Sequence, residues 1–188
     1  MKHLGCASVL LACAALQSAS AAEWKMEPAG SRLEFAATFE KSPAPGMFKE
    51  FDTRLSFDPE KPAGGRLDVR IRVASADMSS ADINKAIAGV EWFDFARYQQ
   101  AEFHSTDIQR GNASSGSYVA RGVLTLKGIQ QPVEVPFKWT EAAEGATMQG
   151  EFVVKRTPFA IGTGEWSATD VIGPQVTVKF TVQLRKVR

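Results

Sequence analysis

Few side chains in this sequence have the types and spacing that catalysis requires. His104 is the only histidine after residue 22, and it stands in the run Glu102-Phe103-His104-Ser105. A zinc site needs several nitrogen or sulfur ligands, and a typical α/β-hydrolase needs a histidine beside a Gly-x-Ser-x-Gly turn, which the sequence lacks. A single imidazole in this setting predicts a surface or structural histidine rather than a catalytic base.

Thiol and nucleotide chemistry have little support either. Cys6 and Cys13 both precede residue 23, so a chain processed there has no thiol for a disulfide, a metal site or a nucleophile. Gly162-Thr163-Gly164 lacks the third glycine of a dinucleotide-binding turn, and no Gly-x-x-x-x-Gly-Lys motif is present. Carboxylates are numerous, but most fall at alternating positions that predict a solvated surface. We therefore expect no enzyme and no cofactor.

The first 22 residues have the pattern of a cleaved export signal. Lys2 provides a positive start, residues 4–16 form an uncharged apolar run, and Ala19-Ser20-Ala21 offers a cleavage site on either side of Ala22. Two alternatives are a buried N-terminal helix and a lipoprotein in which Cys13 is lipidated. We expect residues 1–22 to be removed, leaving one domain over residues 23–188 in the periplasm, with secretion or lipid anchoring as alternatives.

The composition suits a folded domain with its own core. Of 188 residues, 44% are hydrophobic and 23% are charged, which argues against disorder. The formal net charge is +1, and loss of Lys2 leaves basic and acidic side chains equal in number. Such a balance gives no general attraction to nucleic acid or to acidic membranes. No later run reaches the length of a transmembrane helix, so no membrane span is expected in the mature chain.

Alternation of apolar and polar residues dominates the rest of the chain and predicts half-buried β-strands. For example, Leu67, Val69 and Ile71 alternate with charged side chains. Turns rich in proline and glycine separate the strands, and one of them is expected over residues 42–46. The eight predicted strands are residues 33–39, 48–57, 67–73, 101–108, 118–126, 133–139, 148–154 and 176–184.

Short connections between these strands favour antiparallel pairing, and such a set closes as a barrel or packs as a sandwich. Closure removes exposed strand edges, which favours the barrel. Pro136 has no amide hydrogen, so its strand should lie at an edge or a bulge there. Ser80 can cap one short helix that carries Ile83 and Ile87 at helical spacing.

Aromatic residues are the most informative side chains. The sequence has 12 Phe and 4 Trp, most of them in the inward phase of the predicted strands. For any single Phe, a place in a packed core is a sufficient explanation. Collectively they suggest more, because an eight-stranded barrel can hold one small ligand and an apolar lining favours an apolar guest.

Several short motifs, in order along nearly the whole mature chain, resemble the YceI-like family. The opening of that family is similar to Trp24, Ser31-x-Leu33-x-Phe35, Gly46-x-Phe48 and Phe57-Asp58-Pro59. Its helix-to-strand passage is similar to Trp92-Phe93-Asp94 through Tyr98 to Phe103, and its most recognisable stretch to Gly122-x-Leu124-Thr125-Leu126-x-Gly128-Ile129. Its late arginine motif is similar to Lys155-Arg156-x-x-Phe159-x-Ile161-Gly162.

The resemblance implies an all-β, antiparallel, eight-stranded lipocalin-like barrel with one short helical insertion. It also implies an exported protein that binds an amphiphilic lipid (a polyisoprenoid, a quinone or a fatty acyl derivative) in its lumen without catalysis. Whether the chain forms a homodimer stays open. One alternative is a ligand-free interaction module that assists a membrane electron-transfer or stress-response partner. Another is a lipid enzyme that uses paired carboxylates or Arg156.

The candidate binding residues fall into three groups. The expected lining of the lumen is Phe35, Phe39, Leu55, Val69, Ile71, Phe103, Leu124, Phe137, Phe152, Val178 and Phe180. Three aromatic residues are expected near an entrance, namely Phe48, Trp92 and Phe93. Arg156 is expected either to anchor a polar headgroup or to form a surface ion pair.

Overall fold

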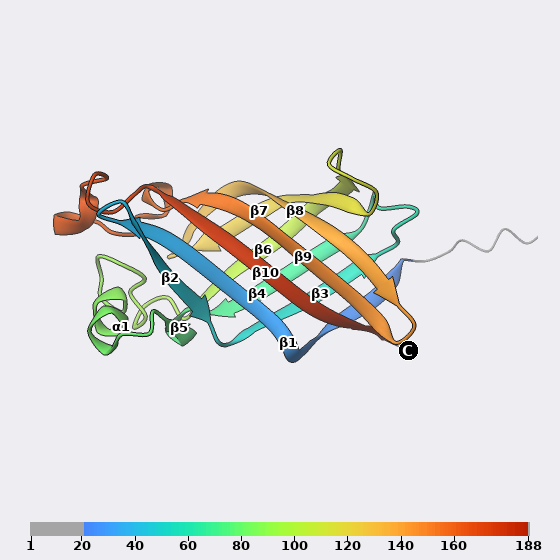
Figure 1. Ribbon diagram of the computed structural model, residues 1–188, viewed down its shortest axis with the longest axis horizontal. Helices are drawn as coiled ribbons and strands as arrows, with labels where there is room; N and C mark the ends of the chain where they lie inside the picture. Colours follow the sequence, from blue (N-terminus) through green and yellow to red (C-terminus); the bar gives the residue numbers. More distant parts are fainter. Residues whose placement is uncertain (1–20, 188) are drawn as a thin grey trace, which may run out of the picture.

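The alternating segments form long antiparallel strands that close on themselves in the computed structural model, which describes residues 21–187 (Figure 1). Residues 1–20 of the predicted export signal lie outside this range. The strands are β1 (Ala22–Phe39), β2 (Ser42–Phe48), β3 (Phe51–Phe57), β4 (Arg66–Arg72), β5 (Ala76–Asp77), β6 (Gln100–Arg110), β7 (Ser117–Leu126), β8 (Ile129–Ala142), β9 (Gly145–Lys155) and β10 (Gln175–Lys186).

The ten strand segments make an eight-stranded barrel, because two of the eight strands are interrupted. Leu33 of β1 pairs with Phe48 of β2, and Lys25 of β1 pairs with Arg54 of β3, so β2 and β3 follow each other along one partner. β4 and β5 likewise follow each other along β3 and β2, on either side of the 3-10 turn η1 (Val73–Ser75). Each strand then pairs with the next, and β10 closes the barrel on β1. The predicted fold class is confirmed.

The turn predicted over residues 42–46 is wrong, because these residues belong to β2. The chain reverses one step earlier, at Glu40 and Lys41, whose φ angles of 47° and 67° fit a tight hairpin turn. Pro43 and Pro45 are compatible with β2 because β5 pairs only with Met47 and Phe48. The proline segment therefore lies where this strand has a free edge within the described chain.

One end of the barrel is filled by five aromatic side chains, which we call the aromatic plug. They are Trp24, Phe57, Tyr118, Phe137 and Trp139, and all five are buried. The ring centroid of Phe57 lies 4.9 Å from that of Tyr118, 5.8 Å from Phe137 and 5.2 Å from Trp139, in edge-to-face geometry. Edge-to-face contacts of this kind add to the stabilisation from burial alone. The barrel therefore has a solid core at this end.

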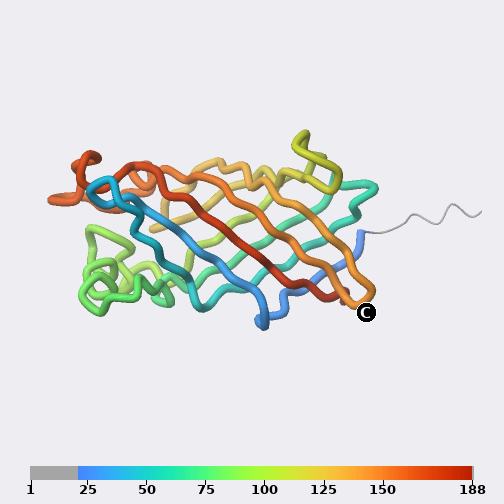
Figure 2. Tube along the Cα trace, in the orientation of Figure 1, coloured from blue at the N-terminus to red at the C-terminus, as the bar shows by residue number. Residues whose placement is uncertain are grey.

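Two segments, which we call the cap, gather at the opposite end of the barrel, where Figure 2 shows them beside the β1–β2 turn. The first is residues 80–99, with α1 (Ala81–Ile87), and the second is residues 156–174, with the 3-10 turns η2 (Thr157–Phe159) and η3 (Gly164–Ser167). The predicted helix cap is confirmed, since the Ser80 hydroxyl accepts a hydrogen bond from the amide of Ile83 at 3.4 Å. In residues 21–187, no helix is long and apolar enough to cross a membrane.

Candidate functional site

An apolar cavity of about 170 Å³ lies inside the barrel, between the aromatic plug and the cap. Its lining comes from the strands around the barrel and from the cap residues Phe93, Arg156, Phe159 and Ile161. Apart from Thr53 and Arg156, every lining residue is hydrophobic. The inward phase of the strands therefore produces a lumen with almost no polar surface, as the alternation in the sequence leads one to expect.

The lining residues reach along the barrel rather than forming a round chamber. On β10 they run from Val176 to Val182, and on β9 from Met148 to Val154. Six residue steps of a strand cover roughly 20 Å. A volume of about 170 Å³ spread over such a length makes a narrow channel.

Eleven of the candidate residues line this cavity. They are Phe35, Phe48, Val69, Ile71, Phe93, Phe103, Leu124, Phe152, Arg156, Val178 and Phe180. Phe48 and Phe93 are two of the three residues expected near an entrance. Their rings meet at the cap end of the cavity, with centroids 6.2 Å apart.

Four candidates lie elsewhere. Leu55 and Phe137 point inward but are packed at the plug end. Phe39 is 44% exposed, because β1 ends beyond the wall of the barrel and Phe39 lies beside Ser42 at the hairpin turn. Trp92 packs against Trp166 within the cap, with ring centroids 5.8 Å apart. For Phe39, the inward position predicted from its phase is wrong.

Fourteen further residues line the cavity without having been singled out from the sequence. Most of them share the inward phase of a predicted strand, so the alternation of apolar and polar residues was enough to predict that they face the lumen. Phe159 and Ile161 belong to a cap segment without periodicity, so the signal for them was the late arginine motif rather than alternation. The fourteen are Leu33, Phe51, Thr53, Leu67, Ala101, Leu126, Val133, Val135, Met148, Val154, Phe159, Ile161, Val176 and Val182.

Arg156 is buried, with 2% of its surface exposed, and its guanidinium is fully occupied by backbone carbonyl groups. Nε donates to Gly173 O at 3.1 Å. Nη1 donates to Ile161 O at 2.8 Å and to Gly162 O at 2.9 Å. Nη2 donates to Trp166 O at 3.1 Å and to Ile172 O at 2.7 Å. All five N–H groups of the guanidinium therefore have a partner.

The surface ion pair that was one interpretation of Arg156 is wrong, because the side chain is buried. The headgroup anchor stays a prediction, and this geometry does not favour it. Within residues 21–187 no carboxylate forms an ion pair with it, and no N–H is left for a headgroup. Burial away from water lowers the pKa of its guanidinium. Arg156 instead fixes the second cap segment by drawing the carbonyl groups of Ile161, Gly162 and Ile172 around one cation.

Lys127, in the turn between β7 and β8, ties the two cap segments together. Its Nζ donates to Val90 O at 2.6 Å and to Ala160 O at 2.8 Å. Burial lowers the pKa of this amine. The amides of Gly162 and Thr163 also donate to Glu91 O, at 2.7 and 3.0 Å. The cap is thus a hydrogen-bonded roof rather than a loose loop.

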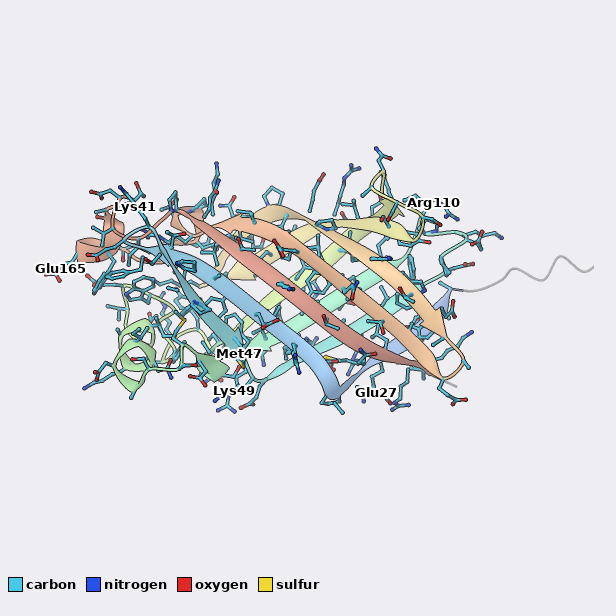
Figure 3. All side chains as sticks on the ribbon, in the orientation of Figure 1. Glu27, Lys41, Met47, Lys49, Arg110 and Glu165 are labelled. Carbon is cyan, nitrogen blue, oxygen red and sulfur yellow. The ribbon has the colours of Figure 1, made fainter. Side chains whose placement is uncertain are left out.

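Most charged side chains other than Arg156 lie on the outside of the barrel, where Figure 3 shows Lys41 and Glu165 at the cap end and Arg110 at the plug end. His104 is on this outer surface, half-exposed, with Nδ1 at 2.6 Å from Asp68 Oδ1 and Nε2 at 3.5 Å from Glu102 Oε2. The hydrogen bond to Asp68 raises the pKa of His104 above 6.5. This imidazole lies outside the lumen and does not face the cavity.

Known proteins resemble this chain in sequence, and others resemble it in structure. Residues 24–184 match the sequence profile of the YceI-like domain. A UPF0312 protein of Photorhabdus laumondii is 35% identical over 88 residues, which is 47% of this chain and 44% of the relative. A UPF0312 protein of Yersinia pestis is 32% identical over 126 residues, which is 65% of this chain and 64% of the relative. The chain thus aligns with about half to two thirds of these relatives.

Solved structures share the fold. The crystal structure of Burkholderia cenocepacia BcnA superposes with a TM-score of 0.79 and 34% identity, covering 84% of this chain and 98% of that one. A polyisoprenoid-binding domain from Saccharophagus degradans superposes with a TM-score of 0.69 and 14% identity, covering 87% of this chain and 98% of the domain. With the sequence match extending over nearly all of the barrel, the chain belongs to the YceI-like domain family.

Proposed function

We propose that this protein is an exported carrier that binds the hydrocarbon tail of an amphiphilic lipid, isoprenoid- or quinone-like, in its lumen. The observation that carries the proposal is the narrow cavity with its almost wholly apolar lining. The structural relative from Saccharophagus degradans, described as a polyisoprenoid-binding domain, supports the same class of ligand.

The shape of the lumen favours a single flexible chain over a wide fused-ring molecule. An apolar cavity of about 150 Å³ is enough for a benzene-sized guest. The lumen has about 170 Å³, arranged along the strands, so a tail threads it lengthwise and displaces half-buried side chains such as Phe35 and Phe152 as it extends.

Burial of the tail supplies the binding free energy. Each 100 Å² of tail surface removed from water contributes roughly 2.5 kcal/mol. The loss of translational and rotational freedom and the ordering of the tail oppose this gain. A tail that buries several hundred Å² of its surface in the lumen therefore binds with useful affinity without any polar contact.

We infer a carrier rather than an enzyme, acting in the periplasm after removal of residues 1–22. The lumen brings together no acid, base and nucleophile among the described residues: its polar members are a threonine and an arginine whose donors are all occupied. The export signal predicted from Lys2, the apolar run and Ala19-Ser20-Ala21 supports the location.

A filled lumen provides the test. Val178 lines the cavity from β10, and the next residue, Lys179, points outward. We expect Val178→Trp to reduce the affinity for dansyl-labelled farnesol by at least about tenfold, since an indole occupies much of the channel. Lys179→Trp, its matched control, should bind like the wild type in the same fluorescence titration. Equal affinities for the two variants, with both folded by circular dichroism, would contradict binding in the lumen.

A further inference from the structure

The wall of the barrel is incomplete between β8 and β9. Their ladder begins at the hairpin pair Ala142–Gly145 and stops at the pair Lys138–Gln149. Residues 129–137 of β8 continue paired with β7, and residues 150–155 of β9 continue paired with β10. Within residues 21–187, no strand pairs with the remaining edges of these two stretches. We call the opening between them the lateral window.

The sequence explains why the ladder stops at this point. Pro136 has no amide hydrogen to give to a neighbouring strand. A Cβ added to Gly150 would overlap the carbonyl oxygen of Pro136, so the two backbones nearly touch here. This close approach at Pro136 and Gly150 forms the lower border of the window, toward the plug end.

The upper border is part of the cap. η2 contacts β8, and the buried side chain of Phe159 lies beneath it. Lys127, in the turn before β8, donates a hydrogen bond to the carbonyl group of Ala160. Two strands, the Pro136–Gly150 contact and η2 therefore frame the window on all sides.

Residues on both sides of the window line the apolar lumen. Val133 and Val135 of β8, and Phe152 and Val154 of β9, belong to the unpaired stretches and line the cavity. Val133, Phe152 and Val154 are only half-buried. On the outer face beside them Val153 is 54% exposed, an unusual position for a valine on a barrel wall. The exposed residues of these two stretches include the apolar Pro132, Pro136 and Val153 and the charged Glu134, Glu151 and Lys155. A hydrocarbon chain therefore passes a mixed outer surface before it reaches the apolar lining.

The edge of β2 that is unpaired within the described chain, at residues 42–46, lies at the cap end of the barrel (Figure 1). The interruption of the wall in β1, by contrast, is filled. Between the β1–β3 and β1–β2 ladders the backbone of β1 makes an excursion from Glu27 to Arg32. The side chains that face this gap, Met26, Leu33 and Thr53, are buried. This seam therefore offers no comparable passage.

Access through the cap has a larger cost. Moving either cap segment aside breaks a hydrogen bond of Lys127, to Val90 or to Ala160, and the one between Glu91 and Gly162. Moving the second segment away from β9 breaks the hydrogen bonds of Arg156. Access between β8 and β9 breaks no ladder, because none is formed there. The window is thus the less costly route for a ligand.

The polar end of an amphiphile also needs partners. In the lumen the donors of Arg156 are all occupied, and Thr53 is the other polar lining residue. At the window every second residue of each unpaired edge turns a backbone C=O and, except at a proline, an N–H toward the gap. These groups can hydrogen-bond a hydroxyl or carbonyl headgroup.

On the basis of the proposed function, we propose that the lipid enters laterally through the window between β8 and β9 and leaves its headgroup there, hydrogen-bonded to the free strand edges. The ligand class that fits is one apolar chain ending in a small polar headgroup. Pro136 and Gly150 then act as positioning residues for the binding site.

Single cysteines on the outer surface test the route, in a background with Cys6 and Cys13 changed to Ser. Val153→Cys stands beside the window, Val90→Cys (71% exposed in the parent) on the cap, and Lys179→Cys on the fully paired wall. Each is modified with a polyethylene-glycol maleimide, and the rate of dansyl-farnesol uptake is followed by fluorescence. Modification at Val153→Cys should slow uptake by on the order of tenfold, and at the other two positions by less than about twofold.

Slowing at Val90→Cys with normal uptake at Val153→Cys would overturn the proposal and assign access to the cap. Absence of probe binding in every protein, unmodified wild type included, would instead refute the proposed function. The headgroup position has its own readout, because the dansyl group sits at the polar end of the probe. A nitroxide at Val153→Cys should quench the dansyl emission more strongly than one at Val90→Cys, and the reverse order would place the headgroup at the cap.

Discussion

Removal of the Arg156 guanidinium should destabilise the cap and the whole barrel. In Arg156→Met, five backbone carbonyl groups lose their donors. An unsatisfied buried acceptor costs about 1–3 kcal/mol before relaxation. Relaxation and water entering the opened cap recover part of this, so we expect a net loss of about 3–5 kcal/mol.

Urea and thermal unfolding followed by circular dichroism measure this loss. For a chain of this size, a loss of about 3–5 kcal/mol lowers Tm by about 6–20 °C. Amide hydrogen exchange should become faster throughout residues 156–174, because the carbonyl groups gathered by the guanidinium include those of Ile161, Trp166 and Gly173.

Two control variants separate this effect from a general loss of charge. Arg54 is an exposed arginine on β3, and Arg54→Met should change stability by less than about 0.5 kcal/mol. Arg156→Lys should recover only part of the loss, because an ammonium group has three donors and a different shape. An Arg156→Met protein within about 1 kcal/mol of the wild type would refute the structural role assigned to this residue.

Three further predictions follow from the packing and the surface. Phe57→Ala in the plug should cost about 3–5 kcal/mol in unfolding free energy, whereas Phe39→Ala, at an exposed position, should cost less than about 1 kcal/mol. Similar losses in the two variants would contradict the buried position of Phe57 and the exposed position of Phe39. Gly122→Ala should cost about 1–3 kcal/mol in unfolding free energy, because its Cβ would overlap the His104 carbonyl oxygen. Gly46→Ala should cost less, because its Cβ meets the movable ends of the Met78 and Phe35 side chains. The opposite order in urea unfolding would count against this reasoning. The His104 imidazole should titrate above 6.5 by NMR and fall toward 6.5 in Asp68→Asn, since the raised pKa comes chiefly from Asp68. Its small contribution to stability is present below pH 6.5 and is lost as the pH rises through the folded-state pKa, and an unchanged midpoint in Asp68→Asn would contradict the pairing.

The barrel itself could be predicted because strand alternation is a local property of the sequence. The phase of a residue says which face of the wall it occupies but not its height along the barrel. Leu55 and Phe137 share the inward phase with the lining residues and nevertheless lie at the plug end, while Phe39 lies beyond the rim. Height depends on the register between strands, which is set by pairings distant in sequence.

Arg156 shows a second limit. The sequence indicates a notable arginine, but its partners are backbone carbonyl groups of residues 161–173, in a segment without periodicity. Their convergence on one cation depends on the closed cap and leaves no trace in side-chain types. Pro136 was more informative, since its predicted place at an edge or bulge is confirmed by the end of the β8–β9 ladder two residues away.

The most direct test of the lipid-carrier account is a pair of mass spectra of the protein expressed with its own residues 1–22 in a bacterial host. One spectrum is recorded under native conditions and the other under denaturing conditions. The account predicts a native mass that exceeds the denatured mass by one small molecule, released by organic extraction as a chain-like lipid, and a denatured mass that matches cleavage beside Ala22. A native mass equal to that of the bare polypeptide, with no mass added by titration with farnesol or a fatty acid, would contradict it.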